Sequence, residues 1–290
     1  MKLSCIAQRE AKLLPILRQE LAMSSTLVKR LKFRGAYFVN GQCVRTNYIV
    51  KPGDLVEVIL DEEDPVYPAQ EGDLSILFED ESFIAIDKPV GMLMHPSPAK
   101  NTDTLANYLL AYYRACGQPS AVHPVSRLDR DTFGVVLLAK NGHVHNKMHR
   151  QLLEGGLKKV YRAAVYGCPK EPEGIIEAPI ARRSAESLLR CIREDGKEAG
   201  TRYRVLEQRG DCALLELEPL TGRTHQLRVH CAHMGFPIVG DPQYGWDPYG
   251  LPHQQLCAVS LGFVHPLTEN FVEIFSKQKV SLDFLGEDTV

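Results

Sequence analysis

The sequence predicts an α+β fold: a mixed, largely antiparallel β-sheet flanked by helices and loops, with a small α+β unit at the N-terminus. Strand and helix patterns do not alternate regularly along the 290 residues, so a doubly wound parallel sheet is not expected. Tight-turn signals such as Asn40-Gly41 and Arg209-Gly210-Asp211 separate short apolar runs, as they do in antiparallel hairpins. The length suits one large domain or two unequal ones.

The charges cancel over the whole chain but not along it. In total, 34 Lys and Arg oppose 36 Asp and Glu, a formal net charge of −2. Residues 1–60 carry ten basic and four acidic side chains, whereas residues 61–90 carry ten acidic and one basic side chain. Residues 123–162 are again basic, with eight basic and three acidic side chains. We therefore expect a basic domain at 1–60, an acidic, extended linker at 61–73 and a body at 74–290.

The basic segment shows helix, turn and strand signals in that order. Apolar residues at helical spacing predict one helix through 13–21, and Ser24, Ser25 or Thr26 can cap a second helix. Four basic side chains lie on or just after this second helix: Lys29, Arg30, Lys32 and Arg34. Strands are predicted at 36–39 and 55–59. The basic helix is either a solvated face or a surface that follows a phosphate backbone.

The body combines many short strands with three helices. Strands are predicted at 75–78, 83–86, 135–139, 158–166, 201–206, 213–217, 255–259 and 271–275. The first helix runs through 105–113, and Asn101 or Thr102 is expected to cap it. The second begins at Asn141, and the third covers 226–234 and ends at Gly235.

The composition also narrows the class of protein. No apolar run reaches the roughly 18 residues of a membrane helix, and the first residues lack an apolar signal core. The eight cysteines are scattered without a CxxC pair, which favours reduced, mostly buried thiols. We expect a cytoplasmic protein that makes no use of a membrane.

Three polar stretches carry the candidate chemistry. They read HPVSRLDRDTFG at 123–134, KKVYRAAVYG at 158–167 and LTGRTHQLRVH at 220–230. Each has a plain structural interpretation: a surface loop with weak ion pairs, a strand with a core tyrosine, and a turn at Gly222 that leads into a helix. His225, His230, Cys231 and His233 suggest zinc, but the five-residue step between the first two suits one helix face poorly, so no metal is expected.

Together these stretches resemble the three motifs of the RluA-type pseudouridine synthases. DKPVGMLMHPS at 87–97 is similar to the opening motif of that family, and PIVGDPQYG at 237–245 and LGFVHP at 261–266 are similar to its closing ones. The resemblance covers roughly 75–278. It implies an isomerase that detaches uracil from the ribose, rotates it and rejoins it through carbon 5. The implied substrate is structured RNA, either ribosomal RNA of the large subunit or transfer RNA, and the reaction needs no cofactor.

The resemblance also assigns candidate site residues. It places the catalytic carboxylate at Asp129, acting as nucleophile at the anomeric carbon or as the base that starts elimination to a glycal. It places the arginine paired with this carboxylate at Arg223, because a guanidinium favours the charged form. Tyr161 matches the tyrosine that stacks under the base and takes the carbon-5 proton. Leu227 matches an apolar residue that lines the pocket.

Other polar residues of these motifs receive weaker roles. Arg130 resembles a residue that takes part when the target base is flipped out, whereas Arg127 is expected to support the loop or contact the RNA backbone. Asp131 is expected to be a loop or ion-pair residue. Three further side chains are expected to be structural or phosphate-facing: Lys88, His95 and Arg228.

The N-terminal segment carries a resemblance of its own. Its helix–helix–hairpin order, with VNGQCV and VKPGDLVEV, resembles the S-four-like RNA-binding domain, a short αL module, over roughly residues 13–60. This implies that Lys29, Arg30, Lys32 and Arg34 bind structured RNA.

Two alternative functions of the whole protein remain: a non-catalytic RNA-binding or assembly factor, and a hydrolase with Asp129 and Asp131 as a carboxylate pair. We expect a monomer.

Overall fold

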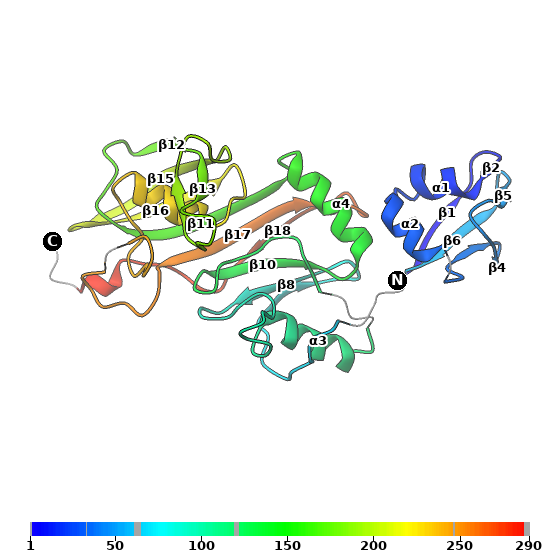
Figure 1. Ribbon diagram of the computed structural model, residues 1–290, viewed down its shortest axis with the longest axis horizontal. Coiled ribbons are helices and arrows are strands. Elements are labelled where there is room, and N and C mark those ends of the chain that lie inside the picture. The colour runs from blue at the N-terminus through cyan, green and yellow to red at the C-terminus, as the bar shows by residue number, and fades with distance from the viewer. Residues whose placement is uncertain (1, 33, 61–64, 119–121, 246, 287–290) are drawn as a thin grey trace.

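The computed structural model describes residues 2–32, 34–60, 65–118, 122–245 and 247–286. They form an N-terminal unit built on a four-stranded sheet and a body built on a ten-stranded sheet, which lie side by side in Figure 1. Nearly all strand pairs are antiparallel, and few helices cover the sheets. The predicted α+β class is confirmed.

The N-terminal unit closes a small core between its sheet and two helices. The strands follow the order β1-β6-β3-β4, while a short β2–β5 pair lies outside this sheet. Tyr37 is buried, and its hydroxyl donates to the carbonyl oxygen of Val28 at 2.8 Å, which ties the sheet to the second helix. The first strand was not predicted from the sequence. The elements are β1 (Lys2–Ile6), β2 (Ala11–Lys12), α1 (Leu13–Gln19), α2 (Ser25–Leu31), β3 (Tyr37–Val39), β4 (Gln42–Cys43), β5 (Ile49–Val50) and β6 (Leu55–Ile59).

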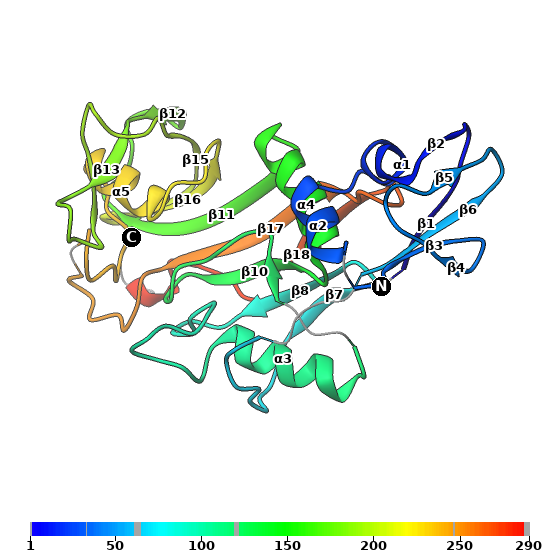
Figure 2. The ribbon, with the colours of Figure 1, turned by 45° about the vertical axis from the view of Figure 1, so that its right-hand side comes forward.

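The large sheet follows the order β12-β15-β16-β11-β17-β10-β8-β7, with β18 beside β17 and β9 beside β10. Among the described residues its one parallel strand pair is β10 with β17, and Figure 2 shows how far β11 extends along the sheet. A small β13–β14 pair lies apart from it. The strands are β7 (Ile76–Glu79), β8 (Phe83–Lys88), β9 (His123–Pro124), β10 (Phe133–Ala139), β11 (Leu157–Tyr166), β12 (Glu173–Glu177), β13 (Ile180–Arg182), β14 (Arg190–Ile192), β15 (Gly200–Arg209), β16 (Cys212–Pro219), β17 (Leu256–Val264) and β18 (Phe271–Phe275).

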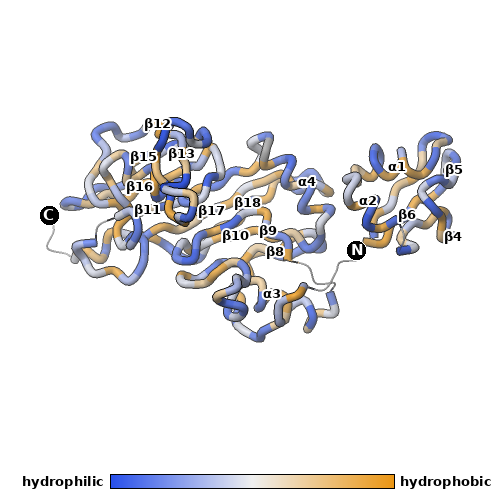
Figure 3. The backbone as a smooth tube through the Cα atoms, in the orientation of Figure 1, coloured by the Kyte–Doolittle hydropathy of each residue, from blue (hydrophilic) through white to orange (hydrophobic). Residues whose placement is uncertain are grey.

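Helices cover both faces of the central strand β10, all of whose residues are buried. Val136 and Leu138 join a cluster with residues of α3 (Leu105–Ala115), and Val135 and Leu137 join another with residues of α4 (Gly142–Leu153). Figure 3 shows the hydrophobic colouring of this central region against the more polar outer loops. The third helix, α5 (Gln226–His233), packs against β14, β15 and β16, and a short 3-10 turn spans Asp283–Leu285.

One predicted helix start is wrong. Neither Asn101 nor Thr102 caps α3, because Thr104 and Asn107 form a reciprocal capping box there. The Asn107 amide also donates to the carbonyl oxygens of Pro68 and Asn101, at 2.8 and 3.0 Å. The cap therefore holds down the preceding chain as well.

The expected linker differs from a hydrated, extended segment in its second half. Residues 61–64 lie outside the described residues. The Gln70 side chain donates to Asp103 at 2.6 Å, and its backbone N–H donates to the carbonyl oxygen of Asn107. A Cβ at Gly72 would lie 2.8 Å from the Tyr108 ring, so this part of the chain packs closely on α3.

All eight cysteines carry free thiols, but the expectation that most are buried is only partly met. Cys212, Cys231 and Cys257 are buried, whereas Cys43 and Cys116 are exposed. No helix in the described part of the chain is long and apolar enough to cross a membrane.

The β10–β17 pair depends on Gly134. Its φ is +103°, and a Cβ would lie 2.2 Å from the carbonyl oxygen of Ala258. We expect Gly134→Ala to lower the free energy of unfolding by about 3 kcal/mol or more, through overpacking and backbone strain. Gly222 is the control, because it has an ordinary φ and open space around its Cβ position. Chemical denaturation of both variants measures the difference, and equal stability would contradict the role of Gly134.

Candidate active site

Asp129 lies on the loop between β9 and β10, and Lys88 holds this loop through a hydrogen bond to its backbone. The Lys88 ammonium is fully buried and donates to the carbonyl oxygens of Pro89, Met92 and Arg130, at 2.9, 2.9 and 2.8 Å. Burial lowers the pKa of Lys88 to about 8, although Asp131 and Asp129 oppose the shift. Because its donors all meet backbone carbonyls, Lys88 is a structural residue.

The arginine that meets Asp129 is Arg228. Its Nη1 donates to Asp129 Oδ2 at 3.1 Å, while Nε and Nη2 form a fork with the fully buried Asp241, each at 2.7 Å. Burial alone would lower the pKa of Arg228, but the carboxylates of Asp241 and Asp129 raise it. The guanidinium therefore stays charged and holds a fixed orientation.

The expected pairing of Arg223 with Asp129 is wrong. Arg223 lies before α5, and its Nε donates to the carbonyl oxygen of Glu198 at 2.9 Å. Arg228 lies in the first turn of α5, on the side that meets the β9–β10 loop. Both arginines belong to the stretch TGRTHQLRVH, so the arginine that contacts Asp129 lies in the same stretch as the predicted one, five positions later.

Tyr161 and Leu227 are buried in one hydrophobic cluster beside the loop that carries Asp129. Tyr161 lies on β11 and Leu227 on α5, and they share one hydrophobic cluster with Leu128, the neighbour of Asp129. Their exposed fractions are 8% and 7%. Burial, and then the charge of Asp129, raise the pKa of Tyr161, so its hydroxyl is protonated at neutral pH.

The two arginines that flank Asp129 differ in their surroundings. Arg127 is exposed on the loop. Arg130 forms a fork with Asp131 through Nε and Nη2, at 2.9 and 2.7 Å. Asp131 is thus an ion-pair residue, as expected, and the Arg130 guanidinium is already engaged by it.

Sequence reasoning missed three residues of the site. Asp241 and Tyr244 lie in PIVGDPQYG, a stretch whose pattern assigns neither of them a role, and the Tyr244 ring lies 4.9 Å from the Arg228 guanidinium carbon. The sequence suggests His225 only as a zinc ligand, yet its Nε2 lies 3.9 Å from Asp129 Oδ2. In the sequence, Asp241 is marked only by its place two residues after the apolar run at 237–239, which does not by itself predict a role in the site.

The remaining candidates lie elsewhere. Both ring nitrogens of His230 are used in the core, by the Thr201 hydroxyl at 2.9 Å and the Ala178 carbonyl at 3.0 Å. The described residues contain no group of three or more metal-ligating side chains. His95 is partly buried, and burial, followed by Arg127 and His123, lowers its pKa.

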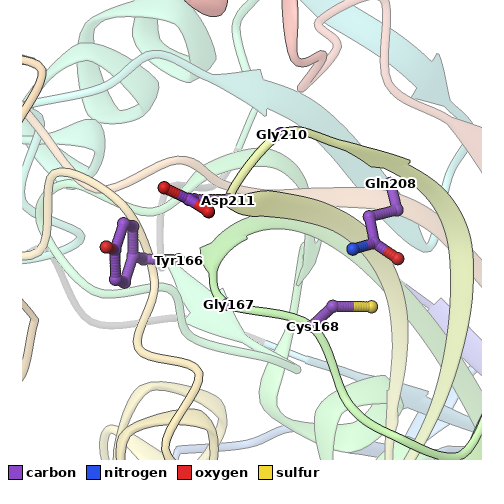
Figure 4. Close-up of a pocket in the computed structure, with 6 residues that line it drawn as sticks. All are labelled: Tyr166, Gly167, Cys168, Gln208, Gly210 and Asp211. Atoms are coloured by element: carbon purple, nitrogen blue, oxygen red, sulfur yellow. The ribbon is translucent and has the colours of Figure 1, made fainter. Parts of the chain in front are cut away.

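A separate pocket of about 270 Å³ lies between the end of β11 and the β15–β16 turn. Figure 4 shows Tyr166 and Asp211 on one side of it and Cys168 and Gln208 on the other. None of the predicted site residues lines this pocket.

The arrangement around Asp129 suits chemistry at a carbon atom. Its side chain is 28% exposed and is held by Arg228 beside the cluster that contains the buried Tyr161 and Leu227. Such a carboxylate can act as nucleophile or general base.

Comparisons with known proteins agree with this chemistry. A family model described as RNA pseudouridylate synthase matches residues 82–233. The RNA pseudouridine synthase YlyB of Bacillus subtilis, described as uncharacterized, is 38% identical over 86% of this chain and 84% of its own. The ribosomal large subunit pseudouridine synthase D of Nitrosomonas europaea is 35% identical over 86% of this chain and 78% of its own.

A solved structure is similar as well. The human RNA pseudouridylate synthase domain containing 1 is 27% identical and superposes with a TM-score of 0.59, over 76% of this chain and 96% of that one. Fold, sequence and relatives agree, and we conclude that the chain belongs to the family of RNA pseudouridine synthases, isomerases that act on uridine in RNA.

Proposed function

We propose that Asp129 carries the isomerisation and that the substrate is structured RNA of the large ribosomal subunit. One observation supports the site above all others: Asp129, Tyr161 and Arg228 come from three separate motifs and meet at one point. The printed names of the relatives from Nitrosomonas europaea and Pseudomonas aeruginosa support the ribosomal substrate. Transfer RNA is the alternative substrate, and mapping of the modified positions distinguishes the two.

In this proposal Asp129 either adds to the anomeric carbon or removes a ribose proton to give a glycal. Uracil leaves through N1, rotates over the Tyr161 ring and rejoins the anomeric carbon through carbon 5. In the first route this bond displaces the Asp129 carboxylate, and in the second Asp129 returns the proton to the ribose. The carbon-5 proton is then lost and N1 gains one, so atoms balance and no co-reactant is consumed. Because the Tyr161 hydroxyl is already protonated, the raised pKa favours a stacking role for Tyr161 over that of proton acceptor.

We also propose that residues 1–60 form an S-four-like domain that binds RNA, joined to a catalytic domain at 74–290 in a monomeric, cytoplasmic protein. The separate sheet and hydrophobic cluster of the N-terminal unit support the division. Lys29 and Arg30 lie in the last turn of α2, and Lys32 and Arg34 follow it. Arg127, exposed beside Asp129, is proposed to contact the RNA backbone close to the target.

The decisive test removes the charge of Asp129. Asp129→Asn is expected to fold and bind RNA but to lower pseudouridine formation at least about a thousandfold, since an amide is neither nucleophile nor base. Asp131→Asn is the matched control, because Asp131 lies two residues away and pairs with Arg130. This variant is expected to keep a rate of pseudouridine formation within about tenfold of wild type. Pseudouridine mapping on ribosomal and transfer RNA measures both. Wild-type protein that binds RNA without modifying any uridine would instead favour the non-catalytic factor.

A second test separates the two arginines of one motif. Arg228→Lys keeps the charge but removes the fork to Asp241, so we expect the single-turnover rate to fall about tenfold to a hundredfold. The free energy of unfolding is expected to fall by about 3 kcal/mol, because a buried carboxylate loses its geometry. Arg223→Lys should match wild type in both measurements. The opposite ranking would restore Arg223 as the partner of Asp129.

The basic helix can be tested through salt dependence. Lys29→Glu with Lys32→Glu is expected to weaken RNA binding and to reduce the slope of log affinity against log salt by about one for each phosphate that the variant no longer neutralises. Lys170→Glu, at an exposed lysine in a loop of the body, is the control for a charge reversal away from α2. Equal slopes for all three proteins would contradict an RNA-binding role for α2.

A further inference from the structure

His225 occupies an unusual backbone position at the start of α5. It is the N-cap residue of the helix with φ 57° and ψ 19°, the left-handed region, yet its side chain makes no cap hydrogen bond. A left-handed residue other than glycine carries strain that the surrounding structure must hold in place. The side chain is instead turned towards Tyr244 and Asp129.

The hydrogen bonds of Tyr244 orient the imidazole. The Arg190 backbone N–H donates to the Tyr244 hydroxyl oxygen at 2.7 Å, and His225 Nδ1 lies 2.8 Å from the same oxygen. In the tautomer with the imidazole proton on Nε2, the Tyr244 hydroxyl donates to Nδ1 while its oxygen accepts from Arg190. Burial, with Arg228 and Arg190 nearby, lowers the pKa of His225 against the pull of Asp129 and Asp241, so the ring is neutral at neutral pH.

Nε2–H and the Arg228 guanidinium approach the same oxygen of the nucleophile. Arg228 Nη1 lies 3.1 Å and His225 Nε2 lies 3.9 Å from Asp129 Oδ2. No described residue donates a hydrogen bond to Oδ1. The two donors on one side therefore leave the other carboxylate oxygen for the substrate.

We propose that His225 is a positioning residue for Asp129. Tyr244 holds its imidazole with Nε2–H towards Oδ2, and this 3.9 Å contact shortens to a hydrogen bond when substrate binds, so that Oδ1 faces the reacting ribose. The inference rests on the proposed role of Asp129. It assigns His225 and Tyr244 a function in rate and none in RNA affinity.

The test uses the full-length protein and a large-subunit RNA fragment in which the wild type forms pseudouridine. Tyr244→Phe keeps the ring beside Arg228 but removes the hydroxyl, and His225→Gly removes the imidazole while relieving the left-handed backbone. We expect each to lower the single-turnover rate about tenfold or more with RNA affinity unchanged. His225→Gly is expected to melt no lower than wild type. Tyr249→Phe, whose hydroxyl meets Cys212 outside the site, is the matched control and should keep the wild-type rate.

A double-mutant cycle gives the sharpest readout. If Tyr244 acts through His225, adding Tyr244→Phe to His225→Gly produces no further loss of rate. Independent losses that multiply, wild-type rates for both single variants, or losses confined to RNA affinity would each overturn the proposal. An active Asp129→Asn would show separately that the role of Asp129 had failed. An inactive Asp129→Asn beside fully active His225 and Tyr244 variants would reject this inference alone.

Discussion

The fork between Arg228 and Asp241 is the interaction on which the rest of the site depends. Asp241 is fully buried and Arg228 nearly so, and each would be strongly destabilising without the other. The fork leaves Nη1 of Arg228 free of Asp241 and directed at Asp129, a residue 99 positions earlier in the chain. One ion pair thus brings the closing motif, α5 and the β9–β10 loop together and sets the orientation of the carboxylate that we propose does the chemistry.

Two strands of the large sheet, β8 and β10, hold the loop that carries Asp129. Gly134 lets β10 approach β17 in the one parallel pair of the large sheet, directly after the loop that carries Asp129. Lys88, at the end of β8, donates to the Arg130 carbonyl in that same loop. The loop is therefore anchored at its centre and at its end, which allows a partly exposed carboxylate to keep a fixed geometry although it lies on no helix or strand.

Much of the fold could be predicted from periodicity and turns, because β10 and α4 carry strong local signals such as an unbroken apolar run and Asn141 as a cap. The site divides differently. Asp129, Tyr161 and Leu227 could be predicted from their positions in the motifs, although each motif contains a second residue of the same type. Arg223 and Arg228 could not be separated, because both are arginines of one motif and only the start of α5 decides which reaches Asp129. Asp241 and Tyr244 act through contacts distant in sequence, which no local pattern reveals.

The charged groups around Asp129 also explain why its two oxygens are not equivalent. Lys88, Asp241 and Arg228 are buried, and backbone carbonyls or each other satisfy them, so none can rearrange without a large loss of stability. Arg130 is held by Asp131. Among these groups, Asp129 is the one whose carboxylate is not fully engaged by its neighbours, and its Oδ2 accepts a hydrogen bond from Arg228. In the proposed reaction, a substrate stacked on Tyr161 would therefore meet a carboxylate with one oxygen hydrogen-bonded to Arg228 and the other oxygen available for attack.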